Sequence, residues 1–205
     1  MSDPAELYDA VLAGDKKKAE EVTKAALAAN VEPSELAKKY IIPAMAEVGK
    51  RFECNEYFVP ELLIAARAMK AAFQMMPKLP SVGRVVIGTV QGDLHDIGKN
   101  LVASMLEGGG FEVVDLGVDV AADKFVDAAK EQDGTIIALS ALLTTTMTQM
   151  KQVIGALQAA GLRGKTKVMI GGAPITQQYA EEIGADGYSD NASAAVGVAR
   201  KLVAA

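Results

Sequence analysis

The chain contains a single histidine, His95, and an aspartate, Asp93, lies two residues before it. In an extended loop, the Asp93 carboxylate can accept the proton of one imidazole nitrogen and leave the other nitrogen free to bind a metal. Zinc sites need about three or more protein ligands, so this pair cannot form one alone. A lone histidine is otherwise most often a structural residue. Metal chemistry at His95 therefore requires a metal that brings most of its own ligands.

A corrin ring meets this requirement, because it supplies the equatorial nitrogens of its cobalt and leaves the axial positions open. The sequence reads Asp93-x-His95-x-x-Gly98, then residues 99–139, then Ser140-x-Leu142, then residues 143–170, then Gly171-Gly172. These three segments at this spacing resemble the cobalamin-binding signature shared by methionine synthase, corrinoid methyl carriers and several mutases. The resemblance implies that cobalamin, as methylcobalamin or a related corrinoid, is the cofactor and that His95 is the lower axial ligand of its cobalt.

The same resemblance implies which residues surround the cofactor. The nucleotide tail of cobalamin must leave the cobalt when His95 binds, and it then needs a slot inside the domain. Side chains after the third strand and the glycine pair after the fourth would line this slot, since glycine leaves room for an aromatic base. Taken alone, the glycine pair could equally be a tight turn. The expected cofactor-binding residues are Gly92, Asp93, Leu94, His95, Asp96, Ile97, Gly98, Ser140, Leu142, Thr144, Gly171, Gly172, Phe52, Val59 and Leu62.

Two threonines follow the second segment of the signature. The resemblance implies that Thr144 hydrogen-bonds near the ring edge or the nucleotide tail. Thr146 stands where methionine synthase has the serine of an Asp-His-Ser relay. Because a hydroxyl is retained, the resemblance implies a relay of His95, Asp93 and Thr146, and the added methyl group leaves its geometry open. The alternative for both threonines is capping of the helix expected at 145–160.

Residues 84–204 alternate short apolar runs with helical segments. Strands are predicted at 84–90, 112–116, 135–139, 167–170 and 186–188, and helices at 97–107, 121–131, 145–160, 174–183 and 191–204. Continuous apolar strands indicate burial on both faces, hence a doubly wound, five-stranded parallel sheet of the flavodoxin-like (Rossmann-type) α/β class with order 2-1-3-4-5. Ligands of such sheets bind where the strand order reverses, which directs attention to loops 91–98 and 140–146.

Residues 1–76 contain residues typical of helix starts and no convincing strand, so a four-helix bundle is predicted. Its third helix is expected at 33–51, kinked by Pro43, and its fourth at 59–76. Pro77 and Pro80 then interrupt all periodicity. The predicted organisation is a helical bundle at 1–76, a linker and hinge at 77–83, and a cobalamin-binding domain at 84–205.

Residues 48–63 are similar to the part of the methionine synthase cap that covers the methyl group. Phe52, Val59 and Leu62 match its apolar cap residues, and such a cover would keep water and oxidants from cobalt(I). The alternative is that these side chains are simply the core of the bundle. Cys54 lies in this segment and is expected to be a packing residue.

The resemblance covers nearly the whole chain and leaves no room for substrate-activating modules. It implies a non-autonomous carrier that moves a methyl group from a substrate:corrinoid methyltransferase to a second methyltransferase with a tetrahydrofolate or thiol acceptor, assisted by a reductive activating protein. One alternative is the small subunit of an adenosylcobalamin mutase, in which a helical bundle has no obvious task. Another is a cobalamin-sensing regulator, for which residues 1–12 are too short to bind DNA.

The composition of the chain indicates which partners and which cellular compartment to expect. Acidic residues outnumber basic ones 26 to 21, and no basic cluster is interleaved with aromatic residues, so nucleic acid is not an expected partner. A single cysteine, no leader-like amino terminus and no apolar run of about 18 residues predict a cytoplasmic protein without a membrane segment.

Overall fold

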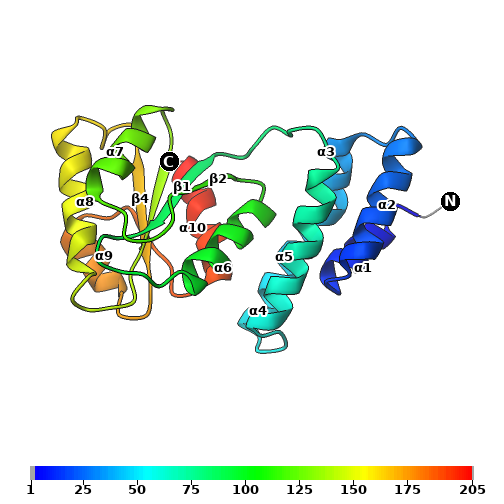
Figure 1. Cartoon of the computed structure of the whole chain (residues 1–205), viewed down its shortest axis with the longest axis horizontal. Helices are drawn as coiled ribbons and strands as arrows, with labels where there is room; N and C mark the ends of the chain where they lie inside the picture. The colour runs from blue at the N-terminus through cyan, green and yellow to red at the C-terminus, as the bar shows by residue number, and fades with distance from the viewer. Residues whose placement is uncertain (1–2, 205) are drawn as a thin grey trace. The chain divides into compact units, whose positions relative to one another are not determined.

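The structure is a computed structural model that describes residues 3–204, so residues 1, 2 and 205 of the expected domains lie outside the described part. The chain divides into two compact units, one running up to Pro80 and the other from Ser81 onward, with Gly108–Gly110 grouped with the first. Figure 1 shows the helices of the first unit and the mixed helices and strands of the second. Each unit is built on its own pattern of apolar residues.

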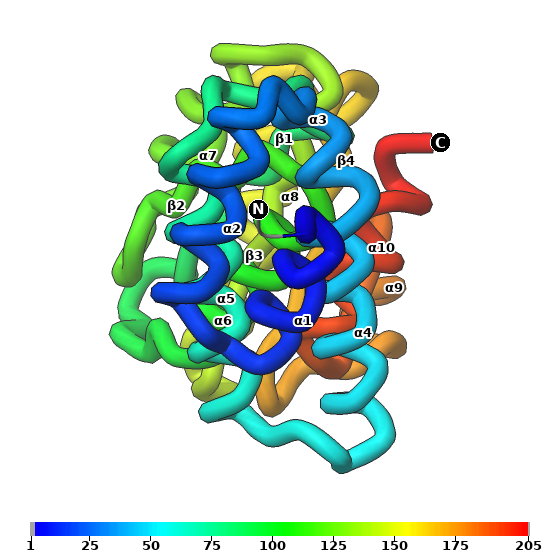
Figure 2. The backbone as a smooth tube through the Cα atoms, turned by 90° about the vertical axis from the view of Figure 1, so that its right-hand side faces the viewer, coloured from blue at the N-terminus to red at the C-terminus, as the bar shows by residue number. Residues whose placement is uncertain are grey.

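The first unit consists of helices. Three segments in its middle follow one another without a break, so the unit has four helical rods, and the predicted bundle is confirmed. The rods pack side by side, α2 and α4 against α5 and α1 against α2 and α4, as Figure 2 also shows. The helices are α1 (Glu6–Leu12), α2 (Lys16–Ala28), α3 (Pro33–Leu36), the π-helical turn η1 (Ala37–Ile41), α4 (Ile42–Glu53) and α5 (Val59–Gln74).

The π-helical turn η1 stands where the sequence predicted one α-helix kinked at Pro43. Proline lacks an N–H, and its ring clashes with the carbonyl four residues earlier, here that of Lys39. A wider turn just before Pro43 accommodates the ring, and α4 then continues to Glu53, two residues beyond the predicted end. Helix α5 ends at Gln74 rather than at 76.

The second unit alternates strands and helices throughout. Every predicted strand and helix is present, although α8 and α9 each begin three residues later than predicted. The strands are β1 (Arg84–Thr89), β2 (Glu112–Asp115), β3 (Ile136–Ser140), β4 (Lys167–Gly171) and β5 (Gly187–Tyr188). The helices are α6 (Ile97–Gly108), α7 (Ala122–Lys130), α8 (Thr148–Ala159), α9 (Gln177–Ile183) and α10 (Ala192–Ala204).

All strand pairs are parallel, and the order is β2-β1-β3-β4-β5, which confirms the predicted topology. Helices α6 and α10 cover one face of the sheet and α7, α8 and α9 cover the other (Figure 1). Phe125 of α7 is fully buried in the core on this second face, and the burial of such a side chain contributes roughly 1.5–3 kcal/mol to the stability of the fold. The whole of β1 is buried, as its apolar sequence requires.

The register of the strands places the functional loops at one edge. Thr89 pairs with Ser140, and Ser140 pairs with Gly171, so β1, β3 and β4 end level with one another. The loops that follow these strands therefore converge where the strand order reverses, the usual position of a ligand in such a sheet.

Within residues 3–204, no helix has the length and apolar character needed to span a bilayer.

Candidate functional site

His95 lies in the loop between β1 and α6. Its Nδ1 atom is 2.6 Å from the Asp93 carboxylate oxygen Oδ1, and its backbone N–H donates to the same oxygen at 3.1 Å. The His95 side chain is 51% exposed, whereas that of Asp93 is completely buried. When Nδ1 carries the proton that faces Asp93, the lone pair of Nε2 is free. The loop thus presents one nitrogen lone pair on a ring that is oriented by a buried carboxylate.

The second oxygen of Asp93 joins this loop to the one after β3. Oδ2 accepts hydrogen bonds from the backbone N–H of Leu142 at 2.8 Å, from that of Leu143 at 3.3 Å, and from the Thr146 hydroxyl at 2.7 Å. Burial by itself would raise the pKa of Asp93, but the bonds from Thr146, Leu142 and His95 outweigh it and hold this pKa well below its usual range. Asp93 is therefore a carboxylate at physiological pH.

Thr146 is buried beside Asp93 and does not cap a helix. Helix α8 begins at Thr148, and its N-cap residue, Met147, makes no side-chain capping bond. The Thr146 hydroxyl lies 2.7 Å from Asp93 Oδ2 and 3.0 Å from the Leu143 carbonyl oxygen. The extra methyl group of threonine points toward Gly92, where a Cβ atom would sit 3.6 Å from it, so it leaves the hydroxyl in contact with Asp93. Thr144, by contrast, is exposed.

Two residues that the sequence analysis did not single out hold the His95 loop. The Thr89 hydroxyl, at the end of β1, donates to the His95 carbonyl oxygen at 2.8 Å. Asp119, from the loop after β2, accepts the Gly92 N–H at 2.7 Å and donates its own N–H to the Asp93 carbonyl at 3.0 Å. The signal available in advance was their position, because Thr89 ends β1 and Asp119 follows β2, the strand beside β1.

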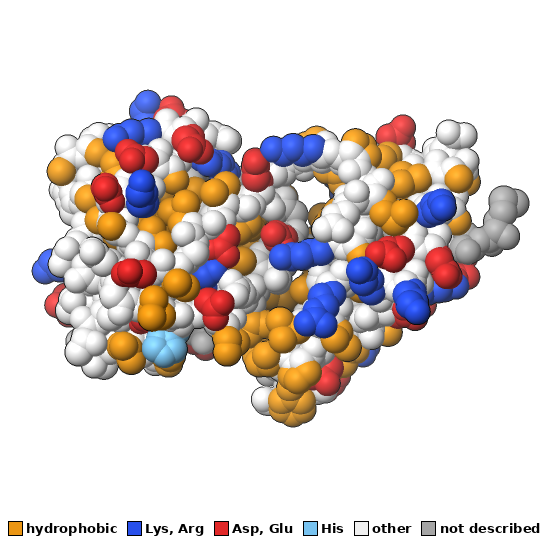
Figure 3. Space-filling model, in the orientation of Figure 1, with side chains coloured by type: hydrophobic (Ala, Val, Ile, Leu, Met, Phe, Trp, Pro, Cys, Tyr) orange, Lys and Arg blue, Asp and Glu red, His pale blue; other side chains and the backbone are white. Residues whose placement is uncertain are grey.

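The loop of His95 and the loop after β3 both carry exposed apolar side chains, here called the apolar collar. Leu94 and Ile97 are each 71% exposed, and Leu142 and Leu143 are 43% and 42% exposed. Figure 3 shows hydrophobic side chains beside the histidine, which is drawn in pale blue. Gly98 is also exposed, and Asp96 turns its carboxylate to the Asn100 amide in the first turn of α6. This apolar collar suits the face of a broad, flat macrocycle.

The glycine pair at the end of β4 lies against the neighbouring loops. A Cβ atom on Gly172, whose φ is +134°, would be 1.9 Å from the Ala141 carbonyl oxygen, and one on Gly171 would be 3.1 Å from the Ser189 carbonyl oxygen. Ser140 is half-buried beside them. Close backbone approach therefore explains why glycine is needed here, and the nucleotide slot remains a prediction.

The three expected cap residues differ in exposure. Phe52 is half-buried in α4 and Val59 is exposed at the start of α5, but Leu62 is 1% exposed and lies on the buried stripe of α5 with Ala65 and Ala66. The helical repeat places Leu62 on the buried side of α5, and the role of all three residues in covering the cofactor stays a prediction.

A more exposed aromatic residue precedes α5. Phe58 is 59% exposed, and its N–H donates to the Glu61 carboxylate at 2.9 Å, which fixes the first turn of the helix. The resemblance to the methionine synthase cap did not predict a role for Phe58. Its position just before a helix with proline in the first turn indicates a turn residue.

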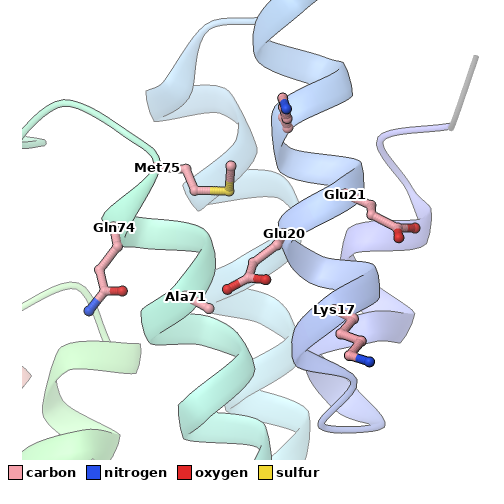
Figure 4. Close-up of a pocket in the computed structure, with 7 residues that line it drawn as sticks. Lys17, Glu20, Glu21, Ala71, Gln74 and Met75 are labelled. Carbon is pink, nitrogen blue, oxygen red and sulfur yellow. The ribbon is translucent and has the colours of Figure 1, made fainter.

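Within residues 3–204, no group of three or more His, Cys, Asp or Glu side chains could hold a metal ion. His95 with its apolar collar therefore fits a metal that arrives with its own equatorial ligands, and a corrinoid fits this description. A pocket in the first unit, between α2 and α5, has a different character (Figure 4). Its lining mixes Lys17, Glu20 and Glu21 with Ala71 and Met75, and it contains no histidine.

Two family models and several known proteins match the chain. Residues 83–197 match a family described as B12 binding domain, and residues 5–76 match a second family with the same description. Trimethylamine corrinoid protein 1 of Methanosarcina mazei is 47% identical over 197 residues, which cover 92% of this chain and 91% of that protein.

Solved structures agree with these matches. The crystal structure of a cobalamin-binding protein from Desulfitobacterium hafniense DCB-2 is 36% identical with a TM-score of 0.82, and the match covers 98% of this chain and 99% of that one. A chain of the methanol:cobalamin methyltransferase complex from Methanosarcina barkeri is 28% identical with a TM-score of 0.84, covering 97% of this chain and 78% of that one.

Replacing Gly172 with alanine should destabilise the second unit by about 3 kcal/mol or more, because the new Cβ would overlap the Ala141 carbonyl and the backbone is in a region unfavourable to L-residues. Urea unfolding followed by far-ultraviolet circular dichroism measures the change. Gly164→Ala is the matched control, since a Cβ there meets nothing within 4 Å, and it should change stability by less than about 0.5 kcal/mol. Equal stabilities of the two variants would contradict this reading.

Stability should fall on acidification partly through Asp93. Its pKa is lowered in the folded state, so the unfolded chain binds the proton first, near an ordinary pKa of about 3.9, and the stabilisation is lost as pH falls below about 5. Unfolding free energies measured between about pH 6 and 3 should decline less steeply in Asp93→Asn than in the unaltered protein. Asp127→Asn, at an exposed position in α7, should keep the original slope. Identical slopes in all three proteins would rule out the assignment.

Proposed function

The chain belongs to the family of B12-binding corrinoid proteins, and we propose that it carries a methyl group on its corrinoid from one methyltransferase to another. The observation that supports this most directly is the orientation of His95, with Nδ1 2.6 Å from a buried carboxylate and Nε2 free at the surface. One oriented nitrogen within an apolar collar is what a corrinoid needs from a protein as its lower ligand. Cobalamin or a related corrinoid is the cofactor of this family.

When bound, the corrinoid supplies a cobalt atom that can accept and release a methyl group. In this proposal His95 Nε2 would hold the cobalt from below, and Asp93 would keep the proton on Nδ1. Asp93 stays ionised because Thr146, Leu142 and the His95 backbone all donate to it.

The proposed methyl donor is a methylated amine, since the relative from Methanosarcina mazei is named a trimethylamine corrinoid protein. A substrate-specific methyltransferase would deliver the methyl group, as the similarity to a chain of a methanol:cobalamin methyltransferase complex supports. A second methyltransferase would pass it to a tetrahydrofolate or thiol acceptor, and a reductive activating protein would restore oxidised cofactor. The lone, exposed thiol of Cys54 suits a reducing cytoplasm.

Residues 77–83 are proposed as a hinge between the helical domain at 1–76 and the cofactor-binding domain at 84–205. The segment has no regular secondary structure and includes Pro77 and Pro80. Movement there would let the helical domain cover the methyl group or expose it to an enzyme. Apolar residues of the α4–α5 turn, among them Phe52 and Val59, are the proposed cover.

The upper ligand of the co-purified corrinoid tests the carrier function. Protein isolated in the dark from cells grown on a methylated amine should release a corrinoid whose upper ligand is methyl, as measured by mass spectrometry. An adenosyl upper ligand would overturn the proposal and favour either a mutase subunit or a cobalamin sensor.

The ligand role of His95 has a direct spectroscopic test. Chain labelled uniformly with ¹⁵N and loaded with unlabelled cob(II)alamin should show an electron paramagnetic resonance spectrum split into doublets, because the axial nitrogen then comes from the protein. A triplet would mean that the corrinoid's own ¹⁴N base is bound. His95→Ala should lose the doublet, and an unchanged doublet in that variant would refute the assignment.

A further inference from the structure

The loop after β2 holds the backbone on both sides of Asp93. The Gly92 N–H belongs to the peptide group before Gly92, and it donates to the Asp119 carboxylate at 2.7 Å. The Asp93 carbonyl belongs to the peptide group after Asp93, and it accepts the Asp119 N–H at 3.0 Å. Asp119 therefore fixes two peptide groups, and all the backbone rotations of Gly92 and Asp93 lie between them.

The loop that contains Asp119 is hydrogen-bonded to β1. Beyond the end of β2, the Leu116 N–H donates to the Ile87 carbonyl, the Thr89 N–H donates to the Gly117 carbonyl, and the Val120 N–H donates to the Thr89 carbonyl. A bridge between Val90 and Val120 extends this pairing past the strand ends. The hydrogen bonds of Asp119 thus connect the Asp93 segment to a loop that is itself hydrogen-bonded to β1.

The backbone conformation of this contact limits which residues can make it. Asp119 has φ of +54° and Gly92 has φ of +82°, both in the left-handed region. Glycine enters this region freely, and asparagine and aspartate are the other residues that tolerate it best. Asp119 combines this tolerance with a side-chain oxygen that reaches Gly92.

We propose that Asp119 is a positioning residue for the axial ligand. By fixing the segment that carries Asp93, it sets the direction from which the Asp93 carboxylate accepts the His95 Nδ1 proton, and hence the direction in which Nε2 points. This inference rests on the proposed function, since the orientation of His95 matters only if His95 is a ligand. Groups that orient a metal-binding histidine are expected to affect ligation even without touching the metal.

The side chain of Asp119 can be altered without straining the loop. Asp119→Gly keeps the left-handed backbone and removes the acceptor of the Gly92 N–H. Asp119→Asn keeps both the backbone conformation and an acceptor oxygen, and removes only the charge. Asp186→Gly is the control, because Asp186 also accepts a backbone N–H, that of Val168 at 2.6 Å, in addition to pairing with Arg163. It does so at the start of β4, away from the carboxyl ends of the strands.

The experiment measures the fraction of bound cob(II)alamin that has a protein nitrogen as its axial ligand, using ¹⁵N-labelled full-length protein at one fixed pH. The ratio of the doublet to all other signals gives the ligation equilibrium. Asp119→Gly should lower this equilibrium constant roughly three- to tenfold, below the 10- to 100-fold typical of direct partners of a ligand, because Asp119 acts through Asp93. Asp119→Asn should restore it to within about twofold of the unaltered protein. Thermal unfolding is recorded for each variant.

The outcomes separate this inference from the function on which it rests. If the unaltered protein gives no doublet, the proposed ligand role of His95 fails. If it gives a doublet and Asp119→Gly gives the same ratio, only the positioning role fails. If Asp186→Gly lowers the ratio as much as Asp119→Gly at a similar loss of thermal stability, the effect is one of general stability and the inference is overturned.

Discussion

The buried negative charge of Asp93 is the constraint on which the rest of the site depends. A carboxylate removed from water is costly unless hydrogen bonds replace its hydration. Here two oxygens receive donors from His95, Leu142, Leu143 and Thr146, and these donors belong to loops that follow different strands. The need to satisfy one charge thus brings the loop after β1 and the loop after β3 into a single arrangement, at the edge where the parallel strands end.

The sheet and its switch point could be predicted because they depend on local patterns. Continuous apolar strands and alternating helices specify the doubly wound topology, and the segment at Asp93 and His95 stands directly after the first strand. What could not be predicted depends on long-range contact. Asp119 contributes through its backbone as well as its side chain, and Leu142 through its N–H, so residue type alone gave little indication of either role.

The helical unit shows the opposite difficulty. A match of apolar residues to a cap predicted a cover that includes Leu62, yet the 3.6-residue repeat of α5 turns Leu62 inward while Val59 and Phe58 remain exposed. A similarity of sequence reports residue type at each position, whereas exposure depends on the helical phase. The turn η1 before Pro43 illustrates the same point, since a proline in a helical pattern leaves open how the backbone accommodates it.

The two backbone N–H groups that bind Asp93 Oδ2 have a consequence for the speed of ligand exchange. Leu142, Leu143 and Thr146 would continue to bind the carboxylate if the imidazole rotated away from it. The loop would therefore keep its shape. If His95 is the ligand that we propose, reorienting it would require only rotation of one exposed side chain, a movement of picoseconds to nanoseconds. A site whose loops keep their shape would add no slow rearrangement to the exchange of this ligand.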